Sequence, residues 1–219
     1  MRKYFRYLIY LYVFIGVSSA SSGSFDDFFV AVNRDDPVMV DSLLKRGFDP
    51  NTPNAQGQYG LFLALREGSL KVARVLVDWP STRVETRNTV DESALMMAAL
   101  KGHTDMARRL IARGADVNKT GWAPLHYAAT GSHAALISML LDAHAYIDAE
   151  SPNGTTPLMM ASQYGSAAAV RQLLDAGADA SLKNQLGLSA QDFAVRSGRQ
   201  EVFEILAAHL RKQRPAGAW

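Results

Sequence analysis

The chain has 219 residues, of which 48% are hydrophobic, so it is long enough to bury a core of ordinary size. It contains no cysteine, which excludes disulfide bonds, thiolate metal ligands and a cysteine nucleophile. Its 23 Lys and Arg against 21 Asp and Glu give a formal net charge of +2, too close to neutral to indicate nonspecific binding to nucleic acid.

The first twenty residues have the organisation of a secretory signal peptide. Arg2, Lys3 and Arg6 precede an apolar run at residues 7–17, and small residues follow at 18–20. This run is shorter than the roughly 20 residues that span a bilayer. We therefore predict a cleaved signal peptide at 1–20 and no membrane span after cleavage, with an uncleaved signal anchor as the alternative. Cleavage would leave 23 − 3 = 20 Lys and Arg against 21 Asp and Glu, a net charge of −1.

The rest of the chain repeats one pattern at a nearly constant interval. The pattern restarts with separations of 33, 34, 30, 33 and 33 residues, at Asp26, Tyr59, Ser93, Ala123, Thr156 and Ser189. A fixed period in this range indicates stacked supersecondary units rather than one globular core. We predict an all-α solenoid of about six helix–turn–helix units at 25–210, after a short linker at 21–24. The basic stretch at 211–219 is predicted to be a disordered tail.

The central copies show how these units would pack. Small residues lie side by side in each first helix, which allows close approach of neighbouring helices, and large aliphatic residues fill each second helix. The connection between the third and fourth copies is three residues shorter than the next one, so we expect a short projecting loop with Trp122 near its base. In the fourth copy His144 stands where glycine would end the helix, and we expect it to adopt a left-handed conformation.

These copies resemble the ankyrin repeat, whose signature is T-P-L-H-x-A-A followed by L-L and G-A-D. The resemblance is clearest at Pro124-Leu125-His126 with Ala128-Ala129, and at Thr156-Pro157-Leu158 with Gly177-Ala178-Asp179. It implies a solenoid with projecting finger loops, and a structural role for His126 in bridging backbone groups of adjacent turns. It also implies that partners contact the finger residues and the ends of the first helices.

The sequence contains no persuasive catalytic constellation. It has no phosphate-binding loop, no HExxH motif and no G-x-S-x-G motif. Asp116 and Asp179 lie in turns, where a carboxylate commonly accepts local backbone hydrogen bonds. We predict that the protein is not an enzyme and uses no cofactor or metal.

When the contact positions of the ankyrin family are placed on the corresponding residues of each repeat, they form a strip whose residues are mostly uncharged or apolar. Exposed aromatic and arginine residues are the usual anchors of protein interfaces. The residues predicted to contact a partner are Arg66, Glu67, Val90, Leu100, Lys101, Trp122, Thr130, Gln163, Tyr164, Leu186 and Arg196. Trp122 and Tyr164 are the expected anchors, although Trp122 could instead pack on its own finger.

These observations predict a monomeric, exported scaffold that binds and modulates another protein, but not nucleic acid, through the concave face of the repeats. We expect it in a bacterial periplasm, with secretion as the alternative. By resemblance, exported ankyrin proteins support a periplasmic enzyme such as a catalase or neutralise a toxin as immunity proteins, and the residues do not choose between these roles. A self-associating envelope component and an enzyme that uses the groove as a substrate cleft are the remaining alternatives.

Overall fold

The computed structural model describes residues 23–213, which are helices joined by loops and contain no strand. This confirms the all-α prediction. The chain divides into two compact units, one up to Arg83 and one from Val84 onward. The predicted signal peptide at 1–20 lies outside the described residues, as do residues 214–219 of the predicted tail.

The N-terminal unit contains a helix over residues 23–33, followed by α2 (Pro37–Lys45), α3 (Gly60–Glu67) and α4 (Leu70–Asp78). The first helix begins at residue 23, so the predicted linker at 21–24 overlaps its first turn. The rings of Phe25 and Phe29, one turn apart, meet edge to face with centroids 5.0 Å apart and favour this early start. Phe28 is fully buried and stacks on Phe48 at 4.5 Å, which ties the helix to the loop after α2.

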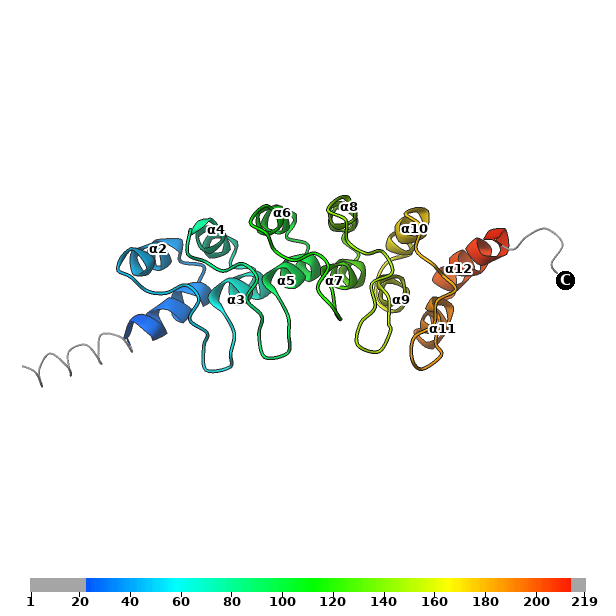
Figure 1. The fold of residues 1–219 in the computed structure, drawn as a ribbon, viewed down its shortest axis with the longest axis horizontal. Coiled ribbons are helices and arrows are strands. Elements are labelled where there is room, and N and C mark those ends of the chain that lie inside the picture. Colours follow the sequence, from blue (N-terminus) through cyan, green and yellow to red (C-terminus); the bar gives the residue numbers. More distant parts are fainter. Residues whose placement is uncertain (1–22, 214–219) are drawn as a thin grey trace, which may run out of the picture. The chain divides into compact units, whose positions relative to one another are not determined.

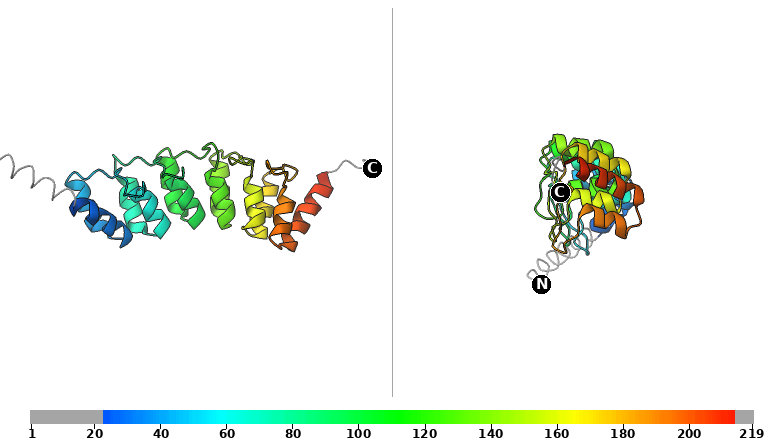
Figure 2. Two further views of the ribbon diagram at one scale, coloured as in Figure 1. Left: turned by 90° about the horizontal axis from the view of Figure 1, so that it is seen from below. Right: turned by 90° about the vertical axis from the view of Figure 1, so that its right-hand side faces the viewer.

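The C-terminal unit contains four helix pairs. They are α5 (Ala94–Lys101) with α6 (Thr104–Ala112), α7 (Pro124–Gly131) with α8 (Ala134–Asp142), α9 (Pro157–Gln163) with α10 (Ala167–Asp175), and α11 (Ala190–Arg196) with α12 (Gln200–Gln213). Figure 1 shows α5, α7, α9 and α11 in one row and α6, α8 and α10 in a second row above it, on the side opposite the projecting loops. Figure 2 shows the loops of this unit gathered along one edge of the helices.

The first helix of each pair begins where the sequence pattern restarts. Ser93, Thr156 and Ser189 are the N-cap residues of α5, α9 and α11, and their hydroxyls accept hydrogen bonds from backbone N–H groups three residues later, at 3.3–3.4 Å. Such bonds satisfy donors that the first helical turn leaves without an internal partner. The starts of α5, α9 and α11 are therefore encoded locally, which helps to make the period visible in the sequence.

The core of the C-terminal unit lies between the two rows of helices. Leu110, Leu140 and Leu173 of the second helices are fully buried. Gly165, after α9, is buried, and a Cβ added there would lie 2.5 Å from the carbonyl oxygen of Ala129. The close approach of α9 to α7 thus depends on the absence of a side chain at this position.

Helix ends follow the expected turn chemistry. His144, after α8, has φ = 62°, so the predicted left-handed conformation is confirmed without a glycine. The final helix extends beyond its predicted end, since residues 211–213 belong to α12 rather than to a disordered tail. Arg211 Nε donates a hydrogen bond to the Ala207 carbonyl at 3.2 Å, and Arg211 and Lys212 place positive charge at the helix C-terminus, where the helix dipole favours it. Along residues 23–213, no helix has both the length and the apolar character needed to cross a membrane.

Candidate functional site

The loop before α7 is shorter than the later loops that join successive helix pairs of the C-terminal unit. Eleven residues (113–123) separate α6 from α7, whereas fourteen (143–156) separate α8 from α9 and fourteen (176–189) separate α10 from α11. In Figure 1 this loop projects less than the loops before α5, α9 and α11. We call the surface formed by these four loops and by α5, α7, α9 and α11 the finger-side surface.

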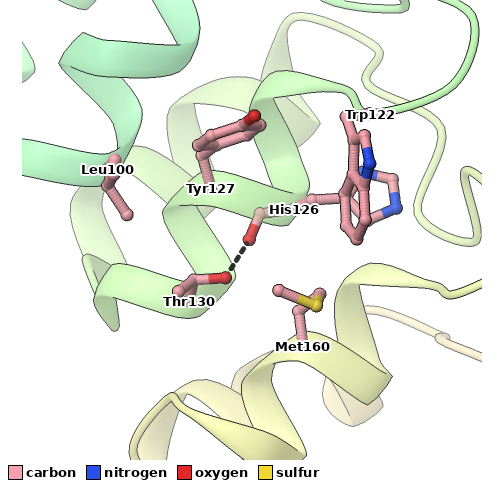
Figure 3. A pocket seen from close by; sticks show the side chains of 6 residues that line it. All are labelled: Leu100, Trp122, His126, Tyr127, Thr130 and Met160. Carbon is pink, nitrogen blue, oxygen red and sulfur yellow. Dashed lines mark hydrogen bonds between the residues drawn. The ribbon is translucent and has the colours of Figure 1, made fainter. Parts of the chain in front are cut away.

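An apolar pocket of about 250 Å³ opens on the finger-side surface beside the short loop. Side chains of three consecutive helix pairs surround a common space, as Figure 3 shows. Leu100 comes from α5, Met160 from α9, and the remaining lining residues, Trp122, His126, Tyr127 and Thr130, come from α7 and the loop before it. Of these, Leu100, Trp122 and Thr130 were predicted to contact a partner. The structure therefore brings three of the predicted residues into one site.

Lys119 fixes the short loop that carries Trp122. Its side chain is only 4% exposed and forms an ion pair with Asp91 in the preceding loop. Its Nζ also donates hydrogen bonds to the Thr120 carbonyl at 3.0 Å and the Trp122 carbonyl at 3.5 Å. The bond from Lys119 lowers the pKa of Asp91, so this carboxylate stays ionised at neutral pH. The buried ammonium group of Lys119 thus joins two loops and fixes the backbone that positions the Trp122 ring.

His126 supports the floor of the pocket. Its Nδ1 accepts a hydrogen bond from the Ala123 N–H at 3.1 Å, so its Nε2 carries the proton and donates to the Thr155 carbonyl at 2.9 Å. Burial lowers the pKa of His126, and the ring is therefore neutral at physiological pH. The Trp122 ring meets it edge to face with centroids 5.2 Å apart. These contacts agree with the structural role that the ankyrin resemblance implied for His126.

Tyr127 forms another wall of the pocket, and its hydroxyl donates a hydrogen bond to Glu92 Oε1 at 3.2 Å. Burial, and then the charge of Glu92, raise the pKa of Tyr127, so the phenol stays protonated. Thr130 is turned inward as well, with its hydroxyl bonded to the His126 carbonyl at 2.8 Å (Figure 3). The hydroxyls near the pocket are therefore already engaged, and the space itself is apolar.

The other predicted contact residues lie outside the pocket. Val90 and Leu186 are exposed on the loops before α5 and α11, at 71% and 73%, and Tyr164 is 60% exposed at the end of α9. Lys101 and Arg196 are exposed and Gln163 is half-buried at the ends of their helices. In the N-terminal unit, Arg66 Nε pairs with Glu67 Oε1 at 2.7 Å, and the Arg66 guanidinium lies 6.0 Å from the centre of the Phe62 ring. These two predicted residues thus contact each other.

Tyr127 and Met160 are lining residues that the sequence interpretation missed. Both occupy the fifth position counted from the pattern restart, at Ala123 and at Thr156. Large side chains at this shared position were the available signal. It was overlooked because the family resemblance directs attention to the finger residues and the helix ends.

The chemistry of the site is that of binding. Its walls are apolar and aromatic, and its histidine is neutral and committed to two backbone groups. Among residues 23–213 no group of three or more His, Asp or Glu side chains could hold a metal ion. An apolar pocket with a few fixed polar groups is typical of a recognition site.

The fold and this surface define the class as a helical repeat protein with an open recognition face. A sequence model described as "Ankyrin repeats (3 copies)" matches residues 28–120, 81–151 and 140–215. The chain therefore belongs to the ankyrin repeat family, whose repeats serve generally as protein-binding scaffolds rather than as enzymes.

Relatives of the chain include eukaryotic and bacterial proteins. It is 32% identical over 155 residues to the B-cell lymphoma 3 protein homolog of Mus musculus. The aligned region covers 68% of this chain and 35% of that protein. It is 32% identical over 162 residues to the nuclear factor NF-kappa-B p105 subunit of Gallus gallus, covering 71% and 16% respectively. An ankyrin repeat-containing protein of Treponema pallidum (strain Nichols) is 30% identical over 171 residues, covering 78% and 47%. The chain thus spans less than half the length of each of these relatives.

Proposed function

We propose that this chain is an exported scaffold that binds another protein through its finger-side surface and modulates that protein. The observation that carries the proposal is the open pocket between α5, α7 and α9, which holds the half-buried Trp122. Apolar pocket walls that are exposed to water are unfavourable, and a partner's side chain that entered the pocket would remove these walls from water.

The exposed residues around the pocket support the same proposal. Val90, Tyr164 and Leu186 carry large apolar side chains on the loops and helix ends of one surface. Tryptophan and tyrosine residues that lose water on binding often contribute most of the affinity of a protein interface, and the contacts around them help to exclude water. We assign Trp122 and Tyr164 as the anchors and Val90 and Leu186 as flanking contacts.

An affinity capture with the full chain as bait tests the binding role. The matched baits carry Trp122→Ala with Tyr164→Ala, or Val38→Ala, which removes a large apolar side chain that is 77% exposed on α2, an element that does not belong to the finger-side surface. We expect one protein to be recovered by the wild type and by the Val38 variant and lost by the double variant. Recovery of the same proteins by all three baits would contradict the assignment of the surface. A captured toxin would assign the neutralising role, and a captured enzyme the supporting role.

Export rests on the predicted signal peptide and needs its own test. N-terminal sequencing of the protein from a periplasmic or culture extract should find Ser21 as the first residue. A protein that keeps residues 1–20 would contradict cleavage, and one that stays in the cytoplasm would contradict export. A sedimentation series over a range of concentrations tests the monomer prediction, because a self-associating envelope component would sediment faster as its concentration rises.

A further inference from the structure

The walls of the pocket have a chemical character beyond being apolar. Three aromatic rings, those of Trp122, His126 and Tyr127, lie around it (Figure 3). The faces of aromatic rings are electron-rich and attract a cation within about 6 Å of the ring centre, tryptophan most strongly. Since His126 is neutral, none of the three rings carries a positive charge that would repel such a cation.

Glu92 adds a negative charge beside these rings. Its Oε1 accepts a hydrogen bond from the Tyr127 hydroxyl at 3.2 Å, and its Oε2 accepts one from Asn88 Nδ2 at 2.9 Å. Both donors are neutral. Neighbouring Asp91, in contrast, is paired with Lys119 and with Arg87. Within residues 23–213 no cationic side chain forms an ion pair with Glu92, so its carboxylate is held in place by neutral donors.

The remaining walls suit an aliphatic chain. Leu100 and Met160 are half-buried and present apolar groups to the same space. Lysine and arginine side chains bury their methylene stems against such surfaces while the charged end remains near polar groups. A guanidinium also stacks on aromatic rings and matches a carboxylate with two parallel hydrogen bonds.

We propose that the pocket accepts an arginine or lysine side chain of the partner protein, with its stem against Leu100 and Met160 and its charge beside the faces of Trp122 and Tyr127 and near Glu92. The proposal rests on the protein-binding function and names the chemistry of the partner's anchor. A hydrophobic anchor would fill the walls equally well, but it would gain nothing from the negative charge of Glu92, which is bonded to the hydroxyl of the lining residue Tyr127. The attraction to that charge makes the basic side chain the better complement.

Small probes test the pocket directly on the full chain. Butylammonium and butylguanidinium carry the charge, and 1-butanol is their neutral counterpart. All are titrated at constant ionic strength while the indole N–H signals are followed by ¹H–¹⁵N NMR. Trp122→Phe identifies the Trp122 signal among the three tryptophans of the chain. We expect the two cations to shift this signal saturably and 1-butanol to leave it in place.

Two charge variants extend the probe test. Glu92→Gln keeps an acceptor for the Tyr127 hydroxyl and removes the charge, so the cations should bind about fivefold to tenfold more weakly. Asp142→Asn removes one negative charge from the exposed end of α8, in the second helix row, and should leave binding within about twofold. Binding of 1-butanol as strong as that of the cations, equal effects of the two variants, or no shift with any probe would each overturn the proposal.

A selection of short random peptides on the immobilised full chain separates this inference from the binding function itself. Peptides that share a basic residue and lose affinity for the Glu92→Gln variant support the inference. Peptides that share an apolar anchor, and that bind the Glu92→Gln variant as well as the wild type, overturn it while leaving the protein-binding function intact.

Discussion

Replacing His126 with leucine should destabilise the fold through two hydrogen bonds at once. The substitution removes the acceptor for the buried Ala123 N–H and the donor for the buried Thr155 carbonyl. A buried group that loses its hydrogen-bond partner costs about 1–3 kcal/mol. Because the Thr155 carbonyl also accepts a hydrogen bond from the Ser151 N–H at 3.0 Å, it keeps one partner, and we expect a loss of about 2–4 kcal/mol in the free energy of unfolding.

Methionine provides the matched control, because the chain already uses it at this place. Met96 and Met159 occupy the corresponding positions of α5 and α9, and each Sδ accepts a hydrogen bond from the N-cap N–H, at 3.3 and 3.4 Å. His126→Met should restore this contact but not the bond to Thr155, and sulfur is a weak acceptor. We therefore expect His126→Met to lose about 1 kcal/mol less than His126→Leu.

The two variants are compared by urea unfolding, followed by circular dichroism. The same experiment has a pH signature, because burial lowers the pKa of His126 in the folded chain. The unfolded chain then binds a proton near pH 6.5 that the folded chain does not, so stability is complete above about pH 6.5 and falls as the pH drops below it. The loss should be at most about 1.4 kcal/mol per pH unit. If His126 causes it, the difference in stability between wild type and His126→Met should shrink as the pH falls below about 6.5. A difference that stays constant with pH would mean that another residue causes the loss.

Equal unfolding midpoints for the leucine and methionine variants would refute the hydrogen-bonding argument. A loss below about 0.5 kcal/mol for His126→Leu would do the same, because it would mean that neither backbone group depends on the imidazole.

Three further changes test the packing and the site. Leu173→Ala removes a fully buried side chain of α10 and should cost about 2–5 kcal/mol by denaturant unfolding, whereas Leu141→Ala, at a half-buried position, should cost less. Gly165→Ala places a methyl group 2.5 Å from the Ala129 carbonyl oxygen and should cost about 1–3 kcal/mol, and an unchanged melting temperature would contradict the close approach of α9 to α7. Trp122→Ala should lower stability by only about 1 kcal/mol, the value of one edge-to-face aromatic pair, yet abolish partner capture. A large fall in its melting temperature would place Trp122 in the core.

The fold could be predicted from the sequence because its determinants are local and repeated. The hydroxyl caps at Ser93, Thr156 and Ser189 each lie three residues from the group they bind, so these three repeats carry their own start signal. The same locality made the left-handed conformation of His144 predictable. The ends of the repeat array were less accessible, because the first helix and α12 extend through side-chain contacts that the repeat pattern does not contain.

The site was only partly predictable, because it is assembled from three repeats. Leu100, Tyr127 and Met160 are separated by about one repeat period each, and the sequence does not show that they face a common space. The buried position of Lys119 was equally hidden, since a lysine in a short loop would ordinarily be solvated. Its carbonyl partners lie in the same loop, but its carboxylate partner, Asp91, becomes visible only once two successive loops lie side by side.

The short loop before α7 connects these observations. A loop of the usual fourteen residues would carry three more residues on the finger-side surface next to Trp122. The chain instead omits them, holds the shortened backbone with the buried Lys119, and leaves Trp122 and Tyr127 on either side of an open pocket. If the short loop were only a loss of residues from the repeat, no buried cation would be required to stabilise the loop. Here Lys119 is bonded to two carbonyls and to Asp91. The irregular loop is therefore best understood as the structural basis of the binding site.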